Sequence, residues 1–237
     1  MARSSLSLNI DLGELPGEPA ELYELATVVN IACGGHAGDE ATMRRALESA
    51  ERSGARVSAH PSYPDRENFG RRSIELPADE LRASVARQVR TLRELAAERK
   101  MRVLAVKLHG ALYHDVSGRE ELARMIVEIF TEEVARGEPE AVLIGPGRGA
   151  LCARARDQEI PYLREGFADR GVDASGRLIP RDAPGALLEE PARAAERAIQ
   201  LAESGEVETI CVHGDTKGAV EIARAVRRAL EEKFLLR

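Results

Sequence analysis

The feature that most constrains the fold of this chain is a regular alternation of short apolar runs and helical patterns. Each run is rich in aliphatic residues, ends near a glycine or proline, and precedes a segment with apolar residues at helical spacing. Seven runs follow this pattern, at residues 6–11, 27–32, 55–59, 102–108, 140–144, 160–165 and 207–212. Alternating strands and helices imply parallel strands with right-handed crossovers, so the sequence predicts an α/β fold.

Two architectures can hold seven parallel strands: a closed (β/α) barrel and an open doubly wound sheet. Polar residues follow nearly every predicted strand, which favours the barrel, because all strand ends of a barrel meet at one mouth. The run from Gly145 to Gly149 lacks the third glycine of a dinucleotide fingerprint, and the sequence contains no GxxxxGK[ST] run. We therefore predict one seven-stranded barrel domain over residues 1–237, with its site at the C-terminal mouth.

Composition limits the classes of partner. The net charge of -6 argues against nucleic acid or an anionic membrane, although it leaves a local basic cleft open. No apolar run approaches the roughly 18 residues of a membrane span, and the first residues lack the apolar core of a secretory signal. The three cysteines form no CxxC pair, which favours reduced thiols and a cytoplasmic location.

Two predicted helices begin at recognisable signals. Asp39 can cap the first-turn amides of a helix that is expected to end near Gly54. Ser117 and Glu120 have the spacing of a capping box, which predicts the start of a helix that reaches about Arg136. The segment 60–76 is long for a connection and contains Pro61 and Pro64, so we expect a lid or binding loop there.

Ionisable side chains gather at the predicted strand ends. They are Asp11, Glu14, His36, Asp39, His60, Lys107, His109, Arg148, Glu165, Arg170, His213 and Asp215. A single histidine in such a loop often only satisfies loop carbonyls, but all five histidines of the chain lie in these loops. Together they predict a polar mouth in which histidines act as acids or bases, because histidine titrates near neutrality.

Part of this set suits a metal ion. Asp11, His36 and His60, with His109 beside them, come from different predicted strand ends and could bind a divalent cation together. No local ligand spacing such as HExxH marks the site, and the same residues can transfer protons without a metal.

Another part of the set is cationic. Lys107, Arg148, Arg170 and Arg181 would make the mouth positive despite the acidic chain. The amides of Gly145–Gly149 could hold a phosphate or carboxylate, or form an ordinary turn between strand and helix. Arg71 and Arg72 could likewise clamp an anion or remain solvated, and Cys33 and Cys211 are expected to be core residues.

Seven blocks of the sequence, in the same order, resemble the LamB/YcsF family, which is now described as the A subunit of 5-oxoprolinase. The blocks are Asp11–Glu14, Asn30–Asp39, Ala59–Asp65 with Phe69–Arg72, Lys107–Tyr113, Phe167–Arg170, Pro184–Ala186 and Cys211–Thr216. Ile10, Gly35 and Leu108 depart from the usual pattern of the family, and none of these departures removes an ionisable group.

The resemblance implies a barrel of the glycoside hydrolase/deacetylase type. It implies ATP-dependent opening of 5-oxoproline to L-glutamate, in a complex with separate 5-oxoprolinase subunits B and C. ATP, with Mg²⁺ or another divalent metal, would then phosphorylate the lactam oxygen, so that water can attack the ring.

On this interpretation two groups of residues form the site. The catalytic candidates are Asp11, His36, His60, Lys107, His109 and His213, of which Asp11, His36 and His60 could also hold the metal. The candidates for binding substrate or ATP are Glu14, Asp39, Arg72, Arg148, Glu165, Arg170, Arg181 and Asp215. Two alternatives stay open: a deacetylase or amidase that uses a metal without ATP, and a non-catalytic binding subunit. The sequence also leaves a homo-oligomer open.

Overall fold

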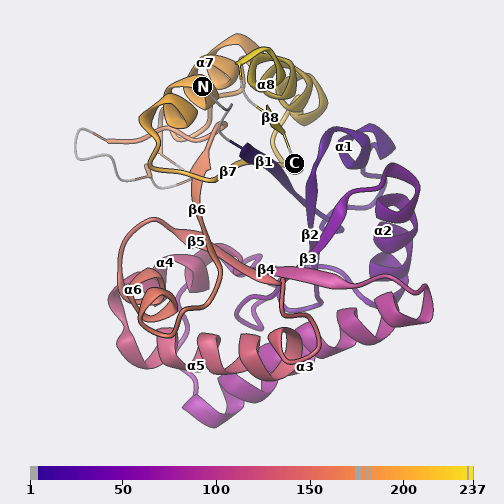
Figure 1. Cartoon of the computed structure of the whole chain (residues 1–237), viewed down its shortest axis with the longest axis vertical. Coiled ribbons are helices and arrows are strands. Elements are labelled where there is room, and N and C mark those ends of the chain that lie inside the picture. Colours follow the sequence, from indigo (N-terminus) through magenta and orange to yellow (C-terminus); the bar gives the residue numbers. More distant parts are fainter. Residues whose placement is uncertain (1–4, 174–177, 180, 182, 234, 237) are drawn as a thin grey trace.

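The computed structural model describes residues 5–173, 178–179, 181, 183–233 and 235–236. Its centre is a barrel of parallel strands (Figure 1): β1 (Ser5–Leu12), β2 (Val28–Ala32), β3 (Arg56–His60), β4 (Val103–Lys107), β5 (Val142–Pro146), β6 (Tyr162–Phe167) and β7 (Thr209–His213). Neighbouring strands follow chain order, and β1 closes the barrel because it pairs with both β2 and β7. The predicted seven-stranded parallel barrel is confirmed.

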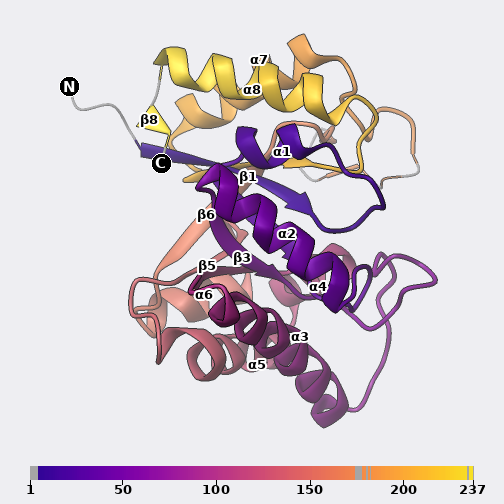
Figure 2. The ribbon, with the colours of Figure 1, turned by 90° about the vertical axis from the view of Figure 1, so that its right-hand side faces the viewer.

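Helices surround the barrel (Figures 1 and 2). They are α1 (Ala20–Leu25), α2 (Glu40–Ser53), α3 (Ala78–Glu98), α4 (Gly110–Gly118), α5 (Glu120–Phe130) with the π-helical turn η1 (Thr131–Ala135), α6 (Ala150–Asp157), α7 (Pro191–Ser204) and α8 (Ala219–Lys233). A short strand, β8 (Leu235–Leu236), pairs in parallel with the start of β1. Among the described residues, no helix is both long and apolar enough to cross a membrane.

The two faces of each strand meet different environments. In β1, Leu8, Ile10 and Leu12 are fully buried in the main core, which the helices complete on the outside of the barrel. Burying each such side chain contributes roughly 1.5–3 kcal/mol to the stability of the fold. The alternate residues Asn9 and Asp11 point into the barrel, because successive side chains of a strand face opposite sides.

The inside of the barrel is apolar at one level and polar at the next. Val28, Ala105 and Ile144 form a small separate apolar cluster. Asn30 and Lys107 lie two residues further along the same strands, on the same face, and are also buried. The apolar level therefore closes the barrel beneath a polar mouth.

The helix signals gave one correct and one wrong prediction. The carboxylate of Asp39 accepts a hydrogen bond from the Thr42 amide at 2.8 Å and caps α2, as predicted. The capping box at Ser117 is wrong, because Ser117 lies in the last turn of α4, a helix that the sequence did not predict. The following helix begins at Glu120 with no side-chain cap.

Candidate active site

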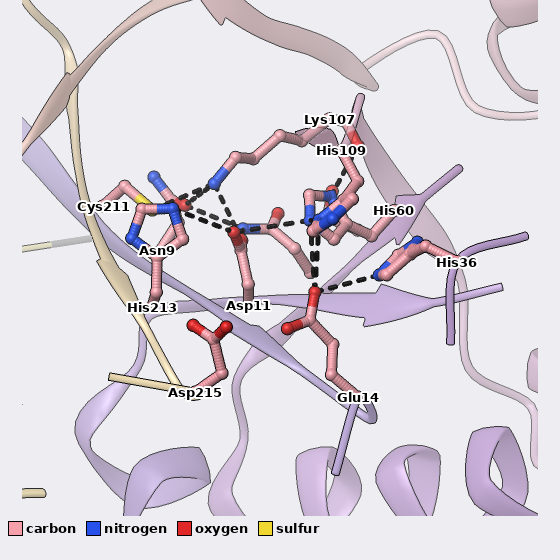
Figure 3. Close-up of polar contacts among 12 residues, drawn as sticks. Asn9, Asp11, Glu14, His36, His60, Lys107, His109, Cys211, His213 and Asp215 are labelled. Carbon is pink, nitrogen blue, oxygen red and sulfur yellow. Dashed lines mark hydrogen bonds and ion pairs between the residues drawn. The ribbon is translucent and has the colours of Figure 1, made fainter. Parts of the chain in front are cut away.

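The parallel register brings the polar strand ends together. Asp11 at the end of β1 pairs with Asn30 of β2 and with His213 of β7. His60 and Lys107 are the last residues of β3 and β4. Figure 3 shows the side chains of Asp11, His60, Lys107 and His213 converging at the mouth of the barrel.

Two histidines face each other through one ring nitrogen each. Nδ1 of His60 donates to the carbonyl oxygen of Lys107 at 2.8 Å, and Nε2 of His109 donates to that of Phe69 at 2.9 Å. When both imidazoles are neutral, each has one N–H, and the other two nitrogens are then acceptors. These atoms, His60 Nε2 and His109 Nδ1, lie only 3.1 Å apart. Their lone pairs repel unless a proton or a cation lies between them.

Glu14 and His36 bring further acceptors to the same point. Oε1 of Glu14 lies 3.3 Å from His109 Nδ1, 3.8 Å from His60 Nε2 and 3.0 Å from His36 Nε2. The rings of His36 and His109 stack with centroids 3.6 Å apart. Burial outweighs the attraction of Glu14 and lowers the pKa of His36 to about 3, and it also lowers the pKa of His109. Protonation of these two rings therefore does not relieve the crowding at neutral pH.

This set of donors fits a divalent cation. The four ligand atoms of Glu14, His36, His60 and His109 lie within 4.8 Å of one another. Backbone carbonyls hold the outer nitrogens of His60 and His109, which is how ligating histidines are usually oriented. The sequence grouped His36, His60 and His109 with Asp11, whereas the structure groups these three histidines with Glu14. Three imidazoles and one carboxylate suit Zn²⁺ or Ni²⁺ better than Mg²⁺, which prefers oxygen ligands.

Asp11 lies next to this cluster and is paired with Lys107. Its Oδ2 is 3.3 Å from His60 Nε2, and its Oδ1 is 2.7 Å from Lys107 Nζ. Nζ also lies 3.1 Å from Asn9 Oδ1 and 2.9 Å from Glu165 Oε1. Burial raises the pKa of Asp11, but attraction to His60 and Lys107 holds that pKa well below its usual value. Asp11 is therefore ionised, and Lys107 neutralises buried carboxylates rather than reaching into the cavity as an unpaired cation.

A further buried carboxylate, Asp169, orients His213. It accepts hydrogen bonds from Nδ1 of His213 at 2.9 Å, from the His213 amide at 3.0 Å and from the Thr216 hydroxyl at 2.9 Å. Burial lowers the pKa of His213, but attraction to Asp169 outweighs it and the net pKa is raised. Nε2 of His213 is left 3.8 Å from Asp11 Oδ2. Asp169 was not among the site residues predicted from the sequence.

A cavity of about 1320 Å³ lies over these groups. The predicted site residues that line it are Asp11, His60, Arg72, Lys107, His109, Arg148, Glu165, Arg170, Arg181 and His213. Its floor thus carries paired carboxylates and histidines, and its wall carries arginines.

The other predicted site residues lie elsewhere. Glu14 and His36 are buried beside His60 and His109, outside the cavity lining. Asp39 is exposed and caps α2, so its contacts give it a structural role. Asp215 is outside the lining too, and it pairs with arginines that are within it.

Two glycines, Gly70 and Gly110, allow close contact between the loops that carry the histidines. Gly110 has φ +59, and a Cβ there would lie 2.3 Å from the carbonyl oxygen of Gly70. That carbonyl accepts a hydrogen bond from the Ala111 amide at 2.9 Å. Gly70 has φ +64 and lies against His36 and His109. Glycine at both positions lets the loop between β3 and α3 rest directly on the histidine cluster.

Comparisons with known proteins match nearly the whole chain to proteins of one family. A model of the LamB/YcsF family matches residues 6–235. The chain is 40% identical to the 5-oxoprolinase A subunit of Nocardia farcinica over 241 residues, which covers 95% of each chain. It is 37% identical to the 5-oxoprolinase A subunit numbered 3 of Pseudomonas syringae pv. tomato over 245 residues, covering 96% of this chain and 94% of that protein.

Solved structures show the same architecture. The lactam utilization protein of Thermus thermophilus matches with a TM-score of 0.87 at 31% identity, covering 98% of this chain and 99% of that chain. A family 4 carbohydrate esterase of Streptomyces lividans matches with a TM-score of 0.55 at 11% identity, covering 99% of this chain and 92% of that chain. The second similarity concerns the fold alone, and it confirms the predicted deacetylase-type barrel.

Proposed function

The chain belongs to the LamB/YcsF family, and we propose that it is the A subunit of an ATP-dependent 5-oxoprolinase, which opens 5-oxo-L-proline to L-glutamate. The observation that carries this proposal is the convergence of Glu14, His36, His60 and His109 beside the Asp11 carboxylate, under a cavity large enough for a small cyclic amide. Such a concentration of buried ionisable groups is costly unless they bind or transform a ligand.

In this proposal Glu14, His36, His60 and His109 hold a divalent cation. When bound, such a cation polarises a carbonyl or phosphoryl oxygen as a Lewis acid. The protein contributes the fixed ligand geometry, because the carbonyls of Lys107 and Phe69 already orient two of the imidazoles.

In the proposed reaction Asp11 accepts one proton and His213 donates another. Asp11 is kept ionised, so its carboxylate can orient a water molecule and accept its proton as the water adds to the ring carbon. His213 has a raised pKa and lines the cavity, so it can donate a proton to the ring nitrogen as the C–N bond breaks. Asp169 fixes the tautomer of His213, in the way a carboxylate orients the histidine of a catalytic triad.

ATP and the partner subunits complete the proposal. A five-membered lactam is a stable amide, and transfer of the γ-phosphoryl group of ATP to its oxygen releases ADP and makes the ring carbon open to attack by water. When the C–N bond then breaks, the former ring carbon is left as an acyl phosphate, and hydrolysis of that acyl phosphate by a second water releases inorganic phosphate and L-glutamate. The arginines of the cavity wall, such as Arg72 and Arg170, supply positive charge for anionic ligands. Subunits B and C would provide the remainder of the enzyme.

The test is to purify the chain alone and together with its candidate B and C subunits, and to measure glutamate and ADP from 5-oxoproline and ATP. We expect equal amounts of both products from the complete complex. Glutamate formed without ATP would instead support a metal-dependent amidase, and no glutamate under any combination would overturn the proposal.

A further inference from the structure

Asp215, two residues beyond β7, joins two arginines from different loops. Arg71 belongs to the loop between β3 and α3, and Arg181 to the segment between β6 and α7. Nη2 of each guanidinium pairs with one oxygen of Asp215, at 2.5 Å for Arg181. The Asp215 side chain is only 11% exposed, so solvent screens these pairs weakly.

The two arginines face the cavity while Asp215 stands behind them. Arg71 and Arg181 both line the cavity, and Asp215 lies outside its lining. Two guanidinium groups and one carboxylate leave one net positive charge at the wall. A guanidinium presents five N–H donors in a planar fork, and each bond to Asp215 uses one nitrogen. This arrangement fits an external carboxylate, which guanidinium groups bind in bidentate fashion.

Three other cations of the cavity are less suited to this task. Lys107 is paired with Asp11 and Glu165 deep in the barrel. Arg170 donates through Nε and Nη2 to backbone carbonyls. The Arg148 side chain is 91% exposed, so water weakens its attraction for a ligand.

Arg71 also lies close to the proposed reaction centre. Its Cζ stacks 4.6 Å from the centroid of the Phe69 ring. That ring lies 5.3 Å from the His36 ring and 5.5 Å from the His109 ring, measured between centroids. One aromatic ring therefore separates the guanidinium group from the histidines.

We infer that Arg71 and Arg181 form the subsite for the substrate carboxylate, that Asp215 positions both guanidinium groups, and that the amide carbonyl then lies at the histidine cluster. This inference rests on the proposed function. It adds to that function the requirement that the cyclic amide carry a carboxylate. An uncharged lactam lacks the group that Arg71 and Arg181 bind, so the subsite binds it less tightly.

The test compares two substrates in the complete complex: 5-oxo-L-proline and its uncharged carboxamide. The variants are Arg71→Gln, Arg181→Gln and Asp215→Asn, with Arg82→Gln as control, because Arg82 bridges Glu128 and Glu132 outside the cavity. Each cavity arginine variant should lower the preference for 5-oxoproline about 10- to 100-fold, through KM, because one charge-assisted contact is lost. Asp215→Asn should lower the preference less, and Arg82→Gln should leave it unchanged.

The outcomes separate the subsite from the overall function. If the wild-type complex forms glutamate and the variants keep its preference for the carboxylate, the subsite is wrong and the proposed function stands. If the variants instead raise the KM for ATP alone, the arginines bind phosphate and the inference is overturned. If the wild-type complex processes neither compound, the proposed function fails and the subsite falls with it. Should a glutamine variant not fold, Arg71→Lys and Arg181→Lys keep the charge, and they should retain part of the preference.

Discussion

Replacing Asp169 with asparagine tests the proposed acid directly. The carboxylate of Asp169 is fully buried and accepts three hydrogen bonds, two of them from His213 and one from Thr216. Asparagine has the same shape but no charge, and its NH₂ group replaces one accepting oxygen. The variant therefore loses the ion pair with His213. Its NH₂ group also faces at least one of the groups of His213 and Thr216 that donate to the wild-type carboxylate.

The magnitude follows from burial. Breaking a buried pair by neutralising one partner costs about 3–5 kcal/mol of folding free energy. Because Asp169 raises the folded-state pKa of His213 above the unfolded value, the ion-pair part of this stability is fully present below the unfolded pKa. It is lost as the pH rises through the folded pKa. Asp169→Asn should therefore destabilise the protein more at pH near 6 than at pH near 9.

Two assays check this prediction. Urea denaturation at the two pH values gives the difference in unfolding free energy, and NMR titration of the His213 imidazole should show a lower pKa in the variant. Turnover by the complete complex should fall by roughly 10³- to 10⁴-fold, since a wrongly oriented histidine cannot deliver its proton. An unchanged pKa of His213 in the variant would refute the proposed coupling.

Two further predictions concern the metal site and the loops. Zn²⁺ at about 100 times its Kd should stabilise the chain by about 2.7 kcal/mol, a rise in Tm of roughly 5–10 °C in calorimetry, because it binds the folded state. Glu14→Gln should remove most of that rise, and an equal rise in both proteins would contradict the ligand assignment. Gly110→Ala should cost about 3 kcal/mol or more by chemical denaturation, because its Cβ would meet the carbonyl of Gly70 at 2.3 Å. Gly17→Ala, at φ +74 with no atom within 4 Å of the added Cβ, should cost only about 1–2 kcal/mol, and equal costs would rule out the packing explanation.

The sequence predicted the barrel because each strand has its own local signal. Alternating apolar runs and helical patterns require no knowledge of distant contacts, and the cap at Asp39 could be read from its own helix start. The error at Ser117 has a tertiary cause. Gly110 turns the chain with φ +59 immediately after His109, and buried Leu112 and Val116 hold α4 in place through Ser117.

Site composition was easier to predict than site grouping. Strand-end position indicated that Asp11, His36 and His60 would lie near the mouth, but the metal-type cluster depends on side-chain direction. Glu14 reaches His36 and His109, whereas Asp11 reaches His60 with one oxygen and Lys107 with the other. Register and loop packing decide such directions, and neither is encoded in local spacing.

Asp169 shows the same limit of sequence reasoning. It is 44 residues away from His213 along the chain, and its backbone position alone resembles that of an ordinary loop carboxylate. Only the pairing of β6 with β7 brings the two residues together.

The histidine cluster is the proposed reaction centre of a 5-oxoprolinase. The most direct measurement of its role is glutamate release from 5-oxoproline and ATP by the complete complex with His109→Ala. Arg82→Gln is the control, since Arg82 bridges Glu128 and Glu132 outside the cavity. We expect a loss of at least about 100-fold for His109→Ala and near wild-type release for Arg82→Gln. Wild-type release from the His109→Ala complex would contradict the proposed reaction centre.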